Sequence, residues 1–361
     1  MMRTDLDVLC VQAGSAIRDA IVQMNRNHLG IVLVVEGDRR LLGTITDGDI
    51  RRAILASVDL RQVVTVLLER KQGTPFAQPI TAPLGADRST YLNLLQQYSA
   101  LHLPILDQGG RVAGLVSLTD LLPEHVLPLR AVVMAGGAGK RLYPLTEDTP
   151  KPMLQVGDKP LLEIIIKQLR QAGITEVKMS LHHQPEKITS YFGNGKEFGV
   201  ELSYVTEDQP LGTVGSLSLL EPPKETTLVM NGDVLTQVDF RAMLIYHREH
   251  HADLTMAVRP REFNVPYGII ECDGPLVKVL QEKPVLHFFV NAGIYLLEPS
   301  VYRYIPNGQR CDMTELIQSL LNDGRPVASF PIQEYWADIG DHACYAQAQH
   351  DVKSWAAEGD A

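Results

Sequence analysis

Cysteine is scarce in this sequence, with four residues in 361, and none of them forms a C-x-x-C pair. Structural zinc sites and disulfide frameworks both need paired or regularly spaced thiols, so neither is expected. A chain without disulfides suits a reducing compartment, and we expect a cytoplasmic protein. The thiols are scattered along the chain as Cys10, Cys272, Cys311 and Cys344.

Positive charge and long hydrophobic runs are also in short supply. Lys and Arg total 33 against 43 Asp and Glu, which gives a formal net charge of −10. Proteins that bind nucleic acid or anionic membranes are normally basic, so we expect neither as a partner. No apolar run approaches the length that spans a bilayer, and the first residues show no signal-peptide core. Any phosphate ligand must therefore be held by a local group of cations.

The first 125 residues contain a degenerate repeat. Residues 34–50 align with residues 105–121 at an offset of 71, and the two copies cover about 1–66 and 75–125. Each copy reads as helix, strand, turn, strand and helix. We therefore expect a small α+β domain whose halves are related by pseudo-twofold symmetry. The alignment pairs Arg40 with Arg111, Gly43 with Gly114, Thr46 with Ser117 and Asp49 with Asp120.

The sequence pattern changes after this repeat. The segment 122–128, LPEHVLP, has two prolines and no periodicity, so we expect a linker, placed at 126–129. From residue 130 onward, short apolar segments such as RAVVMA alternate with amphipathic ones such as LLEIIIKQLRQAG. This alternation predicts a second domain over 130–361 of the α/β class, with a mostly parallel, Rossmann-like sheet covered by helices. Ligands of such sheets bind at the carboxyl ends of the strands.

The segment 134–153, MAGGAGKRLYPLTEDTPKPM, follows the first of these apolar segments. It is no Walker A loop, because Met134 and Arg141 stand where glycine and a hydroxyl residue are needed. It is no dinucleotide fingerprint either, because Leu142 replaces a small residue. The glycines expose backbone N–H groups to a triphosphate, and Arg141 and Lys151 supply fixed positive charge. The alternative is a flexible turn followed by surface cations.

This segment resembles the signature of sugar-1-phosphate nucleotidyltransferases, enzymes that make NDP-sugars. The resemblance runs from Arg130 to the C-terminus and rests on several separate motifs. It implies that Arg141 and Lys151 hold the phosphates of the nucleotide. The loop 207–217, EDQPLGTVGSL, resembles one that lies around the base. The residues that the resemblance assigns to nucleotide binding are Ala135, Gly136, Gly137, Gly139 and Gly212.

Other motifs of the same family imply a metal site and a sugar site. MNGD (230–233) and WADIGD (336–341) resemble the segments that supply two Mg²⁺ ligands, here Asp233 and Asp338. EKP (282–284) resembles the motif whose lysine, Lys283, holds the phosphate of the sugar-1-phosphate. Each residue alone could be a turn or helix-cap residue, and the interpretation rests on their shared order along the chain. The implied contacts to the sugar come from Gly268, Glu282 and Asn291.

The chemistry implied is a displacement at phosphorus. An oxygen of the sugar-1-phosphate attacks the α-phosphate of the NTP, and pyrophosphate leaves, so no general base is needed. His182 and His183 are then interpreted as loop residues near the base and not as catalytic groups. The alternative is a catalytically silent regulatory protein that senses nucleotides or NDP-sugars. Such relatives usually lose a phosphate lysine or a metal aspartate, and this chain has all of them.

The repeat at the front resembles a tandem CBS pair, a module that often binds adenine nucleotides. The resemblance implies ribose contacts from Thr46 with Asp49 and from Ser117 with Asp120, and AMP or ATP as regulators. The same residues also fit capping boxes, with the hydroxyl at the N-cap and the acid three residues later. A purely dimerising module, and hence a homo-oligomer, is the competing role.

This two-part architecture resembles guanylyltransferases of bacterial nonulosonate (legionaminate-type) synthesis. The loop 207–217 also resembles that of mannose-1-phosphate guanylyltransferases. GTP is therefore the expected nucleotide, and a hexosamine-1-phosphate or mannose-1-phosphate the expected acceptor.

Overall fold

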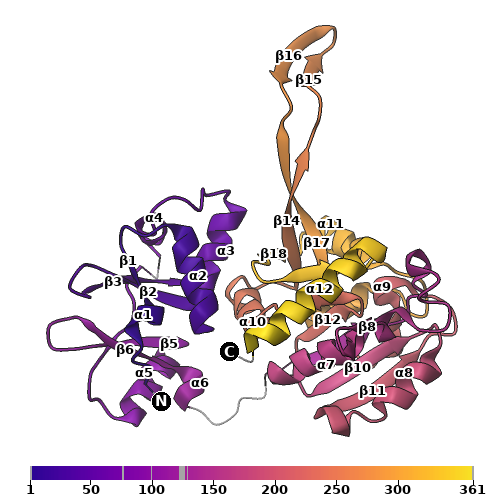
Figure 1. The fold of residues 1–361 in the computed structure, drawn as a ribbon, viewed down its shortest axis with the longest axis horizontal. Coiled ribbons are helices and arrows are strands. Elements are labelled where there is room, and N and C mark those ends of the chain that lie inside the picture. The colour runs from indigo at the N-terminus through magenta and orange to yellow at the C-terminus, as the bar shows by residue number, and fades with distance from the viewer. Residues whose placement is uncertain (1, 75–76, 99, 122–126, 128, 360–361) are drawn as a thin grey trace. The chain divides into compact units, whose positions relative to one another are not determined.

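The computed structural model describes residues 2–74, 77–98, 100–121, 127 and 129–359 (Figure 1). The chain divides into two compact units, residues 1–125 and 126–361, which are described separately here. Much of the segment 122–128, including part of the expected linker at 126–129, lies outside the described residues. No helix in the described part of the chain is long and apolar enough to cross a membrane.

The first unit repeats one arrangement of strands and helices. Each half has a three-stranded sheet in which the first pair of strands is parallel and the second antiparallel. The first half contains α1 (Leu6–Leu9), β1 (Cys10–Gln12), α2 (Ile17–Asn27), β2 (Ile31–Val35), β3 (Leu41–Thr46), α3 (Asp47–Leu55) and α4 (Thr65–Arg70). The second contains β4 (Ala82–Pro83), α5 (Arg88–Gln97), β5 (His102–Leu106), β6 (Val112–Ser117) and α6 (Leu118–Leu121).

The two halves meet at equivalent residues. Arg40 and Arg111, which the sequence alignment pairs, form an antiparallel bridge with each other. The irregularity in the β2–β3 ladder lies between Val34 and Val35, and that in β5–β6 lies 71 residues later. Equivalent residues can face each other only across a twofold axis, so the structure agrees with the pseudo-symmetry that the repeat predicts.

Capping boxes are present in both halves. In the first, the backbone N–H and the hydroxyl of Thr46 donate to Asp49 Oδ2, at 2.9 and 3.0 Å. Asp49 is 5% exposed and also forms ion pairs with Lys71 (2.6 Å) and Arg52 (2.7 Å). In the second, the hydroxyl of Ser117 donates to Asp120 Oδ2 at 2.7 Å.

Arg3 lies 3.5 Å from Asp120, so this carboxylate too has a cationic neighbour. In this structure these four residues therefore act as helix caps, as the capping alternative states. A ligand that contacts them would have to compete with these hydrogen bonds and ion pairs.

A seven-stranded sheet, in the order β11-β10-β7-β12-β17-β14-β18, forms the centre of the second unit. Four of its six strand pairs are parallel, while β17 runs antiparallel to both neighbours. The predicted mostly parallel sheet is thus confirmed. Its strands are β7 (Arg130–Met134), β10 (Glu176–Leu181), β11 (Glu201–Thr206), β12 (Thr227–Asn231), β14 (Leu254–Asn264), β17 (Val285–Leu297) and β18 (Val327–Pro331).

Helices cover both faces of this sheet because its strands are apolar on both sides. Along β7, Ala131 and Val133 face one core while Val132 faces another, as the alternation of a strand requires. The first core packs against α7 (Leu161–Gln171), α8 (Pro185–Phe192), α10 (Phe240–Glu249) and α12 (His342–Gly359). The second packs against α9 (Gly212–Gly215), α11 (Met313–Asn322) and two 3₁₀ helices, Ser216–Leu219 and Pro299–Tyr304.

Short elements connect these layers. Two-stranded ladders join β8 (Gln155–Val156) to β9 (Lys159–Pro160) and β13 (Val234–Thr236) to β19 (Trp336–Asp338). Further 3₁₀ turns cover Lys140–Leu142, Lys151–Met153 and Lys196–Phe198.

A long hairpin projects from the sheet (Figure 1). It consists of the outer parts of β14 and β17, and it continues into β15 (Ile269–Asp273) and β16 (Leu276–Gln281). Its side chains beyond the sheet are mostly exposed.

The two capping boxes differ in burial, which gives a stability prediction. Asp49→Ala removes a cap and leaves the buried Lys71 ammonium without this partner, so the free energy of unfolding should fall by about 2–4 kcal/mol. Asp120→Ala, the matched control, loses a less buried carboxylate and should cost about 1 kcal/mol. Urea denaturation of the full-length variants measures both, and equal losses would contradict the account.

Candidate functional site

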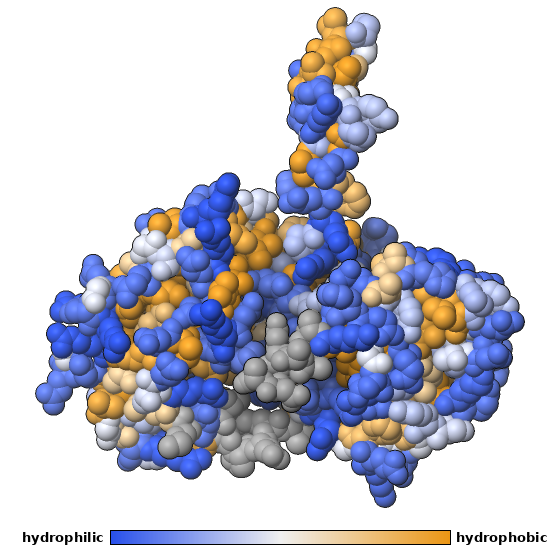
Figure 2. All heavy atoms as spheres, in the orientation of Figure 1, coloured by the Kyte–Doolittle hydropathy of each residue, from blue (hydrophilic) through white to orange (hydrophobic). Residues whose placement is uncertain are grey.

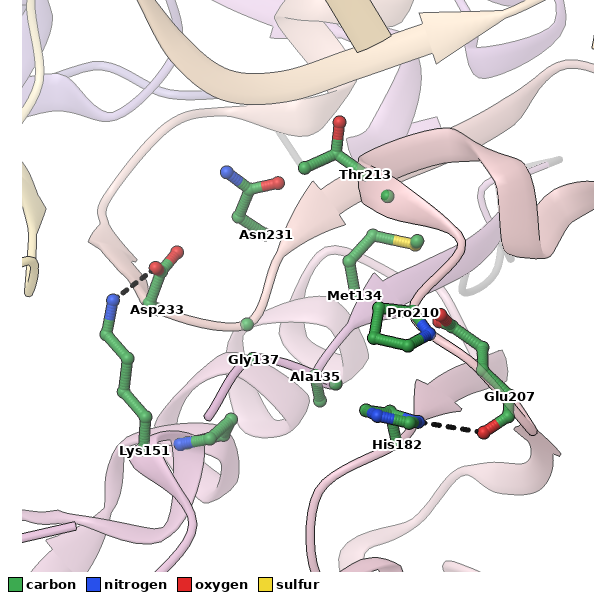
Figure 3. A pocket seen from close by; sticks show the side chains of 14 residues that line it. Met134, Ala135, Gly137, Lys151, His182, Glu207, Pro210, Thr213, Asn231 and Asp233 are labelled. Atoms are coloured by element: carbon green, nitrogen blue, oxygen red, sulfur yellow. Dashed lines mark hydrogen bonds and ion pairs between the residues drawn. The ribbon is translucent and has the colours of Figure 1, made fainter. Parts of the chain in front are cut away.

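A pocket of about 270 Å³ lies at the carboxyl ends of β7 and β12 (Figure 3). The loop after β7, residues 135–137, forms one wall, and the loop 210–213 forms another. Lys151 and Asp233 stand together at one side, while His182 and Glu207 stand at the other. Four of the five residues predicted for nucleotide binding line this pocket: Ala135, Gly136, Gly137 and Gly212.

The loop after β7 needs glycine for two different reasons. Gly139, which is not a lining residue, has a φ of +62°, and a β-carbon there would lie 3.0 Å from the β-carbon of Lys151. This glycine therefore lets the chain turn tightly beneath Lys151. A β-carbon at Gly137 would meet nothing within 4 Å, because Gly137 borders the open pocket. Its backbone is thus accessible to a ligand.

The two predicted metal carboxylates are neighbours, although 105 positions separate them in the chain. Asp233 directly precedes β13, and Asp338 ends β19. These strands pair with Val234 opposite Asp338, and the N–H of Ile339 donates to the carbonyl of Asp233 at 3.0 Å. A two-stranded ladder therefore fixes the distance between the two carboxylates.

The charges around these carboxylates have opposite effects on the pKa of Asp338. Burial raises the pKa of Asp338, and the charge of Asp233 acts in the same direction, while Lys151 and Arg141 oppose it. Lys151 Nζ forms an ion pair with Asp233 Oδ2. Arg141 lies close to Asp338, since a β-carbon at Gly340 would be 3.4 Å from Asp338 Oδ2 and 3.6 Å from Arg141 Nη2. Two cations thus face two carboxylates beside the glycine loop.

One oxygen of this group fits a divalent cation. Asp233 Oδ1 is buried and accepts no hydrogen bond within the described part of the chain. A buried carboxylate oxygen without a partner is costly, and a hard cation such as Mg²⁺ would satisfy it. The described residues contain no group of three or more His, Cys, Asp or Glu suited to a metal. Two carboxylates leave the remaining positions to phosphate and water, which is how Mg²⁺ commonly binds.

Glu207 anchors the loop that carries Gly212, a role that the sequence analysis missed. Its buried carboxylate accepts hydrogen bonds from the Ser180 hydroxyl at 2.5 Å and the Leu211 N–H at 2.8 Å. Its carbonyl lies 2.9 Å from His182 Nδ1. The sequence offers no local signal for this role, because Ser180 lies 27 residues earlier in the chain. His182 lines the pocket and His183 is not among the lining residues, and their interpretation as residues near the base stays a prediction.

The residues predicted for the sugar lie elsewhere. Asn291 is the nearest of them, because its Oδ1 accepts from Gly293 N–H at 3.0 Å, and Gly293 lies against the Asn231 side chain at the pocket. Glu282 and Gly268 face each other on the hairpin, with Glu282 Oε2 2.9 Å from the β-carbon position of Gly268.

Lys283 follows on the same exposed stretch, with a φ of +45°. None of these three hairpin residues lines the pocket. The structure therefore groups the nucleotide and metal residues but keeps the hairpin residues apart from them, and the functional roles of both sets stay predictions.

Comparisons with known proteins identify relatives of both units. A family model described as nucleotidyl transferase matches residues 130–354, and a CBS domain model matches residues 1–56. The chain is 33% identical over 247 residues to a UTP–glucose-1-phosphate uridylyltransferase of Synechocystis, covering 63% of this chain and 64% of that one. It is 32% identical to a mannose-1-phosphate guanylyltransferase of Mycobacterium tuberculosis, covering 62% and 64%. The chain thus spans just under two thirds of the length of these curated relatives.

A crystal structure of a protein named as a glucose-1-phosphate thymidylyltransferase, from Bacillus anthracis, superposes with a TM-score of 0.51. The match has 24% sequence identity and covers 62% of this chain and 94% of that one. At this identity the likeness concerns the fold.

The two glycines of the loop give a matched pair of substitutions. Gly139→Ala should lower the free energy of unfolding by about 1–2 kcal/mol, because its φ is positive and its β-carbon would crowd Lys151. Gly137→Ala should leave stability unchanged but weaken nucleotide binding about tenfold or more, because its methyl group enters the pocket. Urea denaturation and calorimetric titration with GTP measure the two effects. Unchanged GTP affinity in Gly137→Ala would show that the nucleotide binds elsewhere.

Proposed function

Because the chain belongs to the nucleotidyl transferase family, we propose that it transfers a nucleoside monophosphate from an NTP to a sugar-1-phosphate and releases pyrophosphate. The observation that carries this proposal is the meeting of Arg141, Lys151, Asp233 and Asp338 beside the glycine loop. These residues come from three separate segments of the chain, around residues 141–151, 233 and 338, so a plain surface turn does not account for them.

The site suits charge neutralisation and positioning. The backbone of residues 135–137 is open toward the pocket, and Lys151 is held at its side by Asp233. An NTP whose phosphates lie along this loop would present its α-phosphate beside Lys151 and Arg141. The attacking oxygen of the sugar-1-phosphate is already ionised, so this chain would need only to align it and to stabilise the charge of the leaving pyrophosphate.

Asp233 and Asp338 are the residues that would hold Mg²⁺. When bound, Mg²⁺ supplies positive charge to the reacting phosphate oxygens. The buried, unpaired Oδ1 of Asp233 supports this assignment. Lys151, which pairs with Asp233 Oδ2, would then orient this carboxylate.

We favour GTP as the nucleotide and a hexosamine-1-phosphate or mannose-1-phosphate as the acceptor, for bacterial glycan or nonulosonate synthesis. The support is the acidic-Pro-Leu-Gly-Thr loop, which Glu207 holds against the pocket, and the mannose-1-phosphate guanylyltransferase among the relatives.

A regulatory role for the first unit is a separate part of this proposal. The CBS match over residues 1–56 supports adenine nucleotide binding, whereas the capping bonds and ion pairs of Asp49 oppose it. Calorimetric titration of the full-length protein with AMP and ATP, repeated with Asp49→Ala and Asp120→Ala, decides between them. Binding that is lost in either variant supports an adenine nucleotide site in the first unit, and the absence of heat leaves the unit as a structural element.

A pyrophosphate-release screen tests the reaction itself. Four NTPs are offered in turn with glucosamine-1-phosphate, mannose-1-phosphate and glucose-1-phosphate, in the presence of Mg²⁺. We expect turnover with GTP and one of the first two acceptors. Folded protein that is silent with every pair would remove the enzyme proposal and favour a sensing protein instead.

Neutralising either carboxylate tests the metal assignment. Asp233→Asn and Asp338→Asn should each lower kcat by about 100-fold or more, since each removes a charge that holds Mg²⁺ at the reacting phosphate. Calorimetry with Mn²⁺ alone provides a readout besides activity, and its affinity should fall in both variants. Asp158→Asn is the control, because that side chain is 80% exposed on the surface. Normal kcat in Asp338→Asn would disprove its role.

A further inference from the structure

The residues 259–290, called the arm below, carry Lys283 away from the pocket of their own chain. The outer parts of β14 and β17 form an unbroken ladder from Val258 opposite Asn291 to Asn264 opposite Val285. Six residues at a rise of about 3.3 Å separate Val285 from Asn291, so the ladder alone spans roughly 20 Å. Lys283 lies beyond its far end. The four-carbon stem of a lysine cannot cover that length.

Bending the arm at its base does not bring Lys283 closer to Asn291. The register of β14 and β17 shifts only between Met256 and Val258, at the base of the arm. A swing at that point moves the arm as a lever, and Lys283 keeps its distance from Asn291. The other interruption lies around residues 265–268 and 282–284, where Val265 N–H still donates to the carbonyl of Pro284 at 3.1 Å. A bend there moves the tip, while the Val265–Pro284 hydrogen bond keeps the residue next to Lys283 at the far end of the ladder.

The arm also exposes apolar side chains that need a partner. A two-stranded ribbon is marginally stable in water by itself, and exposed apolar patches of this kind mark contact surfaces. Figure 2 shows apolar residues along much of the arm. They include Tyr267, which is 74% exposed, together with Ile270, Leu276, Leu280 and Phe288.

The pocket offers little positive charge for a second phosphate. Among the described residues that line it, Lys151 is the only lysine or arginine, and Asp233 already pairs with it. A second phosphate, that of the acceptor, would need a further cation. Each copy of the chain thus has an arm with an exposed lysine and a pocket whose lining lysine already pairs with Asp233. A twofold dimer would bring the two together twice, because each copy gives an arm and receives one.

We propose that the arm of one copy packs on a second copy of this chain and places Lys283, with Glu282, at the acceptor side of that copy's pocket. The inference rests on the proposed function for the role of Lys283. The apolar arm would supply the contact area, and the active site would be complete only in the dimer.

Complementation between two inactive variants tests this arrangement. Lys283→Ala and Asp233→Asn are co-expressed in full-length chains with different tags, and the mixed dimer is isolated through both tags. Its Lys283→Ala copy keeps an intact pocket and receives Lys283 from the other copy, so one of its two sites is complete. We expect about half of the wild-type kcat, against near-zero kcat for either variant alone. A mixed dimer as inactive as its parents would overturn the proposal.

A second measurement does not depend on activity. Cys272 is an exposed thiol on the arm, Cys311 is buried, and burial raises the pKa of the Cys10 thiol to about 11. In a Cys344→Ser background, a benzophenone maleimide therefore reacts mainly with Cys272. Photolysis of mixed ¹⁴N and ¹⁵N protein, followed by mass spectrometry, should give cross-links that join the two isotopes.

Cross-links confined to single chains, or wild-type protein that sediments as a monomer, would contradict the dimer. If the wild type shows no turnover with any substrate pair but isotope-mixed cross-links form, the proposed function fails while the arm contact stands. The two proposals can thus fail separately.

Discussion

The short ladder between β13 and β19 is the constraint on which the rest of the site depends. It holds Asp338 beside Asp233, although α10, α11, three strands of the central sheet and the whole arm lie between them in the sequence. Lys151 and Arg141 lie around the pair of carboxylates, because two adjacent negative charges are stabilised by positive neighbours. The glycine loop completes the pocket by keeping side chains out of the space beside these charges. The two proposed metal ligands are thus positioned by one two-stranded contact, and the cations lie around them.

Much of this arrangement could be predicted from the sequence. The alternation of apolar strands and amphipathic helices predicted the mostly parallel sheet, and the 71-residue repeat predicted two similar halves in the first unit. Asp233 and Asp338 were selected only because their motifs resemble those of one family, since an aspartate after glycine is by itself an ordinary turn residue. Pattern alone could not have shown that they meet, because their contact depends on two three-residue strands with no periodicity of their own.

Two features escaped prediction for physical reasons. Glu207 acts through a buried carboxylate that accepts hydrogen bonds from the Leu211 N–H in its own loop and from the Ser180 hydroxyl, and the contact with Ser180, 27 residues earlier, leaves no local pattern. The position of Lys283 could not be predicted either. A motif identifies residues that are adjacent in the sequence, but it does not give the direction in which a hairpin leaves its sheet. In the first unit, hydroxyl and acid at a spacing of three fit both a ribose site and a helix cap. The structure shows the caps.

The central claim is that Asp233 and Asp338 together hold the metal at the phosphates of a bound nucleotide. The most direct measurement is a crystal structure with Mn²⁺ and a non-hydrolysable GTP analogue, with anomalous data collected for the metal. The account predicts one anomalous peak within bonding distance of Asp233 Oδ1, an Asp338 oxygen and the nucleotide phosphates. A nucleotide bound in the pocket with the metal held by neither carboxylate would contradict it.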